Sequence, residues 1–143
     1  MSKGNTFEND FLKLIFNGTA IANIADNAAS DPLANLYVSL HSADVGEGGN
    51  QGTNEIAYGD YARVAVVRTS GGWSVSDNEV TNVDPIVFPE CASGTATAAY
   101  FAVGAAAGGA GKVLYKGQLT NPLNISAGIE PRFDAGDLTI TED

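Results

Sequence analysis

The apolar positions of the chain change their spacing near residue 32. Before that point they recur at intervals of three and four, the period of an amphipathic helix. Thr6 is placed to cap the start of this helix and Gly18 to end it. The Ala-rich continuation predicts one or two further helical turns, so we expect a helical segment over 6–29. The apolar stripe of the first helix consists of Phe7, Phe11, Leu14 and Ile15.

Beyond residue 35 the apolar spacing falls toward two, and β-branched and aromatic residues become frequent. Glycine, serine and asparagine separate short runs of this kind, which is typical of strands joined by turns. The predicted strands lie at 36–40, 61–68, 72–76, 79–83, 86–89, 95–104, 112–119 and 137–142, with a less regular pairing segment at 123–128. We therefore predict a mainly β fold: a sandwich, jelly roll or barrel with an N-terminal amphipathic helix.

The length of 143 residues fits one domain over 1–143, made of the segment 6–29 and a β domain 35–143. The longest interruption in the strand pattern is 42–60, nineteen residues with five glycines. A loop of that length in a compact domain is usually functional or mobile. The Gly- and Ala-rich stretch 105–111 predicts a flexible hairpin tip between the strands 95–104 and 112–119.

Charge narrows the classes of partner. Seventeen acidic and seven basic side chains give a formal net charge of −10, which would repel a phosphate backbone, so no nucleic acid is expected. The one cysteine, Cys91, excludes an intramolecular disulfide and fits folding in the host cytoplasm. No apolar stretch approaches the length of a membrane span, so no membrane association is expected either.

The single histidine, His41, is the centre of any histidine-based chemistry. Strand alternation places it on the same face as Ser39, but no G-x-S-x-G nucleophile motif occurs. We expect His41 to lie at a strand end and hydrogen-bond its own loop, and Cys91 to be a buried thiol. A hydrolase that uses His41 or Asp44 remains as a further alternative.

No cofactor or metal site is predicted. The run AAGGAGKV, 106–113, lacks the first glycine and the final Ser or Thr of a phosphate-binding loop, and a strand pattern follows it. The acidic residues of 42–60 do not follow EF-hand spacing, although calcium binding by this loop stays open. Trp73 is expected to anchor a hairpin, although Trp73 and Tyr58 would be candidates for a sugar-binding platform.

Two runs carry a resemblance to a known family: FENDFLKLIFNGTAIANIADNAA (7–29) and LYVSLHSADVGEGGNQGTNEIAYGDYARVAVVRTSGGWSV (36–75). They resemble small phage-encoded virion proteins that are commonly labelled tail-fibre-like. The resemblance extends over most of the chain. It implies a structural protein of a phage particle, and it brings no catalytic residues with it.

Size and acidity lead us to expect a capsid decoration, or cement, protein on the exterior of the phage head. It would act as a homo-oligomer that binds the major capsid protein and other virion proteins, stabilising the assembled shell by mass action. The alternative is a tail-fibre-like or tail-associated module whose loop near 46–52 recognises a host glycan or another tail protein. The candidate subunit or partner contacts are Phe7, Phe11, Leu14, Ile15, Asp44, Glu47 and Tyr58.

Overall fold

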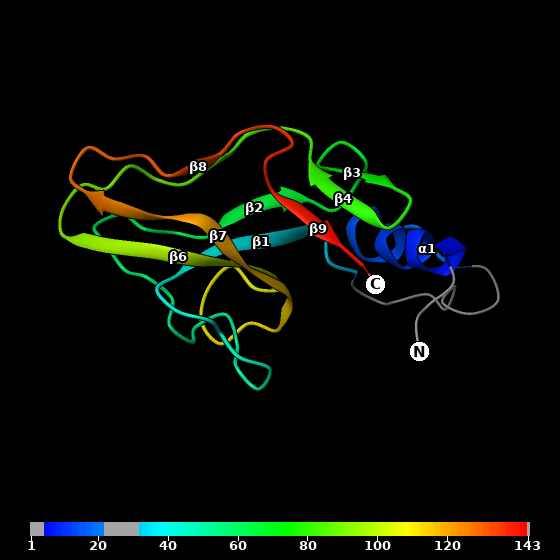
Figure 1. Cartoon of the computed structure of the whole chain (residues 1–143), viewed down its shortest axis with the longest axis horizontal. Coiled ribbons are helices and arrows are strands. Elements are labelled where there is room, and N and C mark those ends of the chain that lie inside the picture. Colours follow the sequence, from blue (N-terminus) through cyan, green and yellow to red (C-terminus); the bar gives the residue numbers. More distant parts are fainter. Residues whose placement is uncertain (1–4, 22–31, 143) are drawn as a thin grey trace. The chain divides into compact units, whose positions relative to one another are not determined.

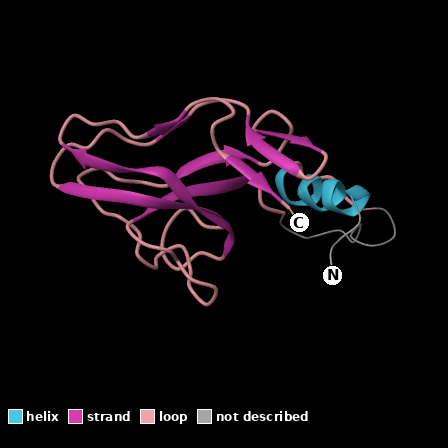
Figure 2. Cartoon of the chain, in the orientation of Figure 1, coloured by secondary structure: helices cyan, strands magenta, loops and turns pink. Residues whose placement is uncertain are grey.

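The fold is mainly β with one helix, which confirms the predicted fold class (Figures 1 and 2). A computed structural model describes residues 5–21 and 32–142. In that part of the chain, no helix is long and apolar enough to cross a membrane. The elements are α1 (Asn5–Phe16), β1 (Asn35–His41), β2 (Val64–Val67), β3 (Trp73–Ser76), β4 (Glu79–Asn82), β5 (Ile86–Val87), β6 (Thr95–Gly104), β7 (Val113–Ser126), β8 (Arg132–Phe133) and β9 (Thr139–Thr141).

Contacts along the chain group these elements into two compact units. Unit 1 comprises Met1–Asn35, Val66–Ile86 and Phe133–Asp143, and unit 2 comprises Leu36–Ala65 and Val87–Arg132. Each unit has a core of its own. The folding of both as the one domain expected over 1–143 stays a prediction.

The core of unit 1 lies between α1 and the antiparallel sheet β3-β4-β9. Phe16 packs edge-on against Trp73 with 4.8 Å between ring centroids, and Trp73 is fully buried at the start of the β3–β4 hairpin. Trp73 is therefore the hairpin anchor that the sequence predicted. Because its ring is enclosed, Trp73 does not offer a surface for stacking a sugar.

The helix α1 differs from its prediction in both extent and orientation. It begins at Asn5, so Thr6 lies inside the helix and is not its cap. It ends at Phe16, where Gly18 takes a left-handed φ of +65°, as predicted. Residues 19–21 are not helical, and the rest of the expected helical segment, 22–29, lies outside the described residues.

The buried face of α1 is made by Glu8, Leu12 and Phe16, one position later than each of the first three residues of the predicted apolar stripe. Phe7 is 40% exposed instead, and its ring lies 6.1 Å from that of Phe11 on the helix surface. The stripe was therefore wrong as a description of the core-facing side. The packing of Phe16 on Trp73 decides the rotation of the helix about its axis.

Unit 2 is built on a four-stranded sheet in the order β2-β1-β6-β7, of which it holds β6, β7 and nearly all of β1. The β1–β6 and β6–β7 pairs are antiparallel, with Val38 opposite Val103 and Val103 opposite Tyr115. The apolar core of this unit consists mainly of Leu36, Val38, Leu40, Ile56, Phe88, Phe101, Val103 and Ile125.

The strand β7 joins two predicted segments, 112–119 and 123–128, into one strand of fourteen residues. Its pairing with β6 is regular up to Gln118 and resumes at Leu123, with a register shift between. Pro122 lies in that shift, where a residue without a backbone N–H breaks no ladder hydrogen bond. The predicted strand 61–68 is shorter in the structure, because Asp60 has a positive φ and Tyr61 N–H closes a turn onto Tyr58. The short strand β8 was not predicted.

Candidate functional site

Two loops of unit 2 lie side by side and form what we call the loop cluster, residues 42–60 and 105–112. The loop 42–60 leaves the end of β1 and folds back, so that its middle reaches the β6–β7 hairpin tip (Figure 1). There the backbone N–H of Gln51 donates to the carbonyl oxygen of Gly111 at 2.8 Å. The stretch 105–112 is thus the predicted hairpin tip, and it is tied to the long loop.

The Gln51 side chain is fully buried, and its amide holds three segments together. Nε2 donates to the carbonyl of Tyr37 at 3.0 Å, while Oε1 accepts the backbone N–H of Ala106 at 3.2 Å. The space for this amide exists because two neighbours are glycines. A Cβ on Gly104 would lie 2.1 Å from Gln51 Cδ, and one on Gly111 would lie 2.4 Å from Gln51 Oε1. Any larger residue there would displace the amide.

Arg63 is the second connector. Its Nε and Nη2 donate to the two carboxylate oxygens of Glu55 at 2.8 and 2.7 Å, a bidentate ion pair. The same guanidinium donates to the carbonyl oxygens of Ala106 at 2.9 Å and Gly109 at 2.6 Å. The Glu55 carboxylate raises the pKa of Arg63, so this cation persists at any working pH. One buried cation therefore closes both loops onto each other.

Tyr61 completes this network from below. Its hydroxyl donates to Glu55 Oε1 at 2.9 Å and accepts the backbone N–H of Leu40 at 3.1 Å. Burial is the main cause that raises the pKa of Tyr61, which keeps the phenol neutral. Since Leu40 belongs to β1, the loop network is fixed directly to the sheet.

His41 is buried and bonds the loop that follows it, as predicted. Its Nδ1 lies 2.9 Å from the carbonyl oxygen of Thr53, and a carbonyl only accepts, so Nδ1 carries the proton. Nε2 then accepts from the Ser39 hydroxyl at 2.9 Å. Burial lowers the pKa of His41, which favours this neutral form. Ser39 is fully buried as well, so the pair has no access to a substrate in this arrangement.

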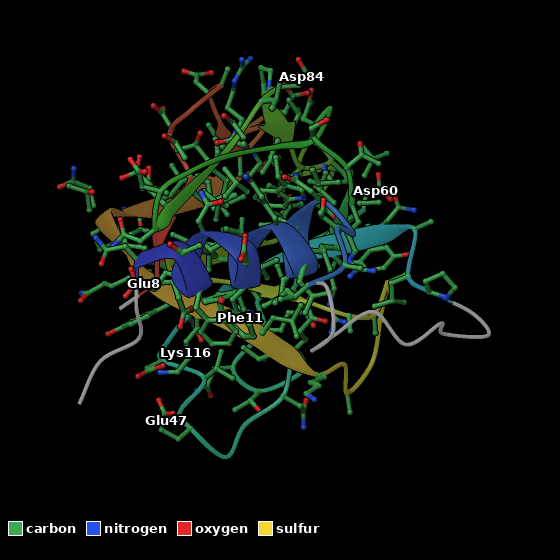
Figure 3. The ribbon with its side chains drawn as sticks, turned by 90° about the vertical axis from the view of Figure 1, so that its right-hand side faces the viewer. Glu8, Phe11, Glu47, Asp60, Asp84 and Lys116 are labelled. Carbon is green, nitrogen blue, oxygen red and sulfur yellow. The ribbon has the colours of Figure 1, made fainter. Side chains whose placement is uncertain are left out.

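Asp44 and Glu47 are exposed on the rim of the loop cluster, and both reach the Lys116 ammonium on β7. The oxygen–nitrogen distances are 2.9 Å for Asp44 and 3.3 Å for Glu47, and Figure 3 shows Glu47 and Lys116 at this rim. The pKa of Asp44 is lowered first by the Gly46 amide that its carboxylate accepts and then by Lys116. Asp44 makes no hydrogen bond to His41 that would support hydrolysis.

The remaining predicted contact residues divide into two groups. Tyr58 is only 9% exposed, and its hydroxyl donates to the carbonyl of Pro89 at 2.7 Å, so its ring supports the loop from inside. Phe7 and Phe11 meet on the surface of α1, with Leu14 and Ile15 half-buried beside them. The structure thus gathers the helix residues in unit 1 and the acidic rim in unit 2.

Sequence reasoning missed Gln51, Glu55 and Arg63, which hold the loop cluster together. The one signal was an arginine inside the apolar run YARVAVV, where a charge needs a partner if it is buried. The chemistry of the cluster is that of a satisfied hydrogen-bond network. Over residues 5–21 and 32–142, no three His, Cys, Asp or Glu side chains gather in a group that could hold a metal ion.

Residues 2–141 match the family described as "Gp80: Podophage GP4 fiber I protein gp80". The chain belongs to this family. The match confirms the resemblance drawn from the two N-terminal runs and makes the chain a phage virion structural protein of the fibre-like kind. No match was found among curated proteins.

Proposed function

We propose that this chain is a building block of a virion fibre and that its role is to bind other virion proteins, not to catalyse a reaction. The observation that carries the proposal is the family match, because it spans residues 2–141 of 143 and the family is a fibre protein. The geometry supports the non-catalytic role. The one Ser–His pair, Ser39 and His41, is enclosed and is used to hold a loop.

The loop cluster is the proposed contact surface of unit 2. Gln51 and Arg63 fix its backbone from inside, so binding there would not require the loops to become ordered first. A preorganised loop loses less conformational entropy on association than a free one. The exposed part is mostly small, with serine, alanine and glycine at 42–43, 46, 48, 52 and 107–110.

A protein partner suits this surface better than a glycan. Sugar recognition commonly relies on an exposed aromatic ring, whereas Tyr58 and Trp73, the two rings considered for that role, are both buried. Small residues allow close backbone approach, and the Asp44–Lys116 pair at the rim offers polar contacts. The partners we propose are therefore other virion proteins, and the charge of −10 disfavours nucleic acid.

Immunogold electron microscopy of intact phage, with antibody raised against this chain, tests the fibre role. Labelling confined to fibres or tail is expected. Dense labelling over the head would contradict the fibre role and favour the capsid decoration expected from size and acidity. Antibody preabsorbed with the pure protein is the control for specificity.

A variant links the surface to assembly. Gly108→Glu adds a long charged side chain at the exposed hairpin tip, where a new Cβ meets nothing within 4 Å. Folding should be unaffected while incorporation into particles falls. Ser74→Glu, an equal charge on an exposed position of β3, is the matched control and should incorporate normally. Equal incorporation of both variants would remove the loop cluster as the contact surface.

A further inference from the structure

Acidic side chains are distributed very unevenly along this chain. All seventeen lie before residue 91 or after residue 129, so the segment 91–129 contains none. The charged side chains of that segment are Lys112 and Lys116, which gives it a charge of +2 in a chain of −10. The segment contains β6, the hairpin tip and β7.

The two units share the charge unequally as a result. Eleven acidic and three basic side chains fall in unit 1, a net charge of −8, whereas six acidic and four basic ones in unit 2 leave −2. Two copies of the chain therefore repel each other mainly through unit 1. A contact between copies costs least electrostatic free energy where the acid-free hairpin meets its counterpart.

The outer strand of that hairpin is β7, the last strand in the order β2-β1-β6-β7. An edge strand presents a row of backbone N–H and C=O groups that can pair with another strand. Proteins commonly protect such an edge with a free lysine or a proline. Here Lys116 is already held by Asp44 and Glu47, and Pro122 lies beyond the regular part of the strand.

The regular part, Val113–Gln118, pairs with β6 from Gly104 to Tyr100 and so is held extended. The opposite edge of the sheet is the four-residue β2, which lies between Arg63 and Arg68. Edge length and the charge of the flanking residues therefore both favour β7.

We propose that two copies of this chain associate through antiparallel pairing of Val113–Gln118 with the same segment of the second copy. The two four-stranded sheets become continuous across a two-fold axis, and the contact is self-complementary and closed. This surface is distinct from the loop cluster and from α1. The proposal goes beyond the fibre role and does not depend on it, since the association is a property of the pure protein.

Sedimentation velocity of the full chain, combined with hydrogen exchange read by mass spectrometry, tests the contact. A monomer–dimer equilibrium is expected, and raising NaCl from about 0.05 to about 0.5 M should strengthen it by screening the repulsion between copies. Backbone amides of 113–118 should gain protection as the protein concentration rises. A protein that stays monomeric in high salt would overturn the proposal, as would protection that arises in α1 or β2 instead.

A pair of charge variants locates the contact independently. Gln118→Glu with Thr120→Glu places two new carboxylates on exposed positions of β7 and should weaken dimerisation by about tenfold. Ser74→Glu with Ser76→Glu adds the same charge at the same spacing on β3, an exposed edge strand of the other sheet, and should weaken it far less. Equal effects of the two pairs would refute the β7 contact. The location of the protein on the phage, read by immunogold, would be unaffected by that result.

Discussion

Removal of the Arg63 guanidinium tests the account of the loop cluster most directly. Arg63→Met keeps much of the side-chain volume but leaves Glu55 without its cation and the carbonyls of Ala106 and Gly109 without their donor. Deleting one partner of a buried ion pair costs about 3–5 kcal/mol, because the remaining charge stays buried. The Glu55 side chain retains 17% exposure, so we expect a value near the lower end, about 3 kcal/mol.

Urea unfolding followed by tryptophan fluorescence and circular dichroism measures this loss of stability. For a chain of this size, about 3 kcal/mol corresponds to a fall in Tm of roughly 10 °C. Lys116→Met, which removes a solvent-exposed ion pair, is the control and should cost less than about 1 kcal/mol. The double variant Arg63→Met with Glu55→Gln should regain part of the stability, since the unpaired carboxylate is gone.

Hydrogen exchange supplies the local readout. In Arg63→Met the amides of 105–112 should exchange faster, because two carbonyls of the tip have lost their hydrogen-bond donor. A destabilisation below about 1 kcal/mol, or unchanged exchange in the tip, would refute the claim that Arg63 joins the loops.

Three further predictions address the loop amide, the histidine and the helix. Gly111→Ala should destabilise by about 1–3 kcal/mol, since its methyl group would meet the buried amide of the 42–60 loop, whereas Gly108→Ala should be nearly neutral in the same urea titration; similar values would contradict the packing described. Burial lowers the pKa of His41 below its ordinary 6.5, so the unfolded chain takes up the proton first as pH falls. The stability of the native chain relative to His41→Gln should therefore be constant above about pH 7 and decline below about pH 6.5, and a difference that rises on acidification would show the opposite sign of shift. Phe16→Ala should cost about 3–5 kcal/mol and the surface change Phe7→Ser less than about 0.5 kcal/mol in thermal unfolding; a reversed order would restore the predicted helix face.

Local pattern determined most of the secondary structure. Alternation and β-branched residues located the strands, because half-buried strands must alternate whatever lies opposite them. The stretch 105–111 was recognisable as a hairpin tip and Gly18 as a helix end, since both depend on the backbone freedom of glycine. The bonding of His41 to its own loop was also predictable, because its partner Thr53 is near in sequence.

The family resemblance was visible in the sequence as well, and the match over 2–141 confirms it. What the sequence could not determine was which expected surface residues are exposed. Tyr58 is enclosed because Pro89, thirty-one residues away, accepts its hydroxyl. Phe7 stays at the surface because Phe16 takes the place against Trp73.

Tertiary structure alone decided the loop cluster. Gln51 and Arg63 bond to residues forty or more positions away, and no local pattern marks a glutamine in a glycine-rich loop as buried. The same holds for β7, where Lys116 meets Asp44 from another part of the chain. Periodicity reports which residues leave water, because that depends on neighbours in sequence. The partner that satisfies a buried polar group depends on how distant segments meet, and only the folded chain brings them together.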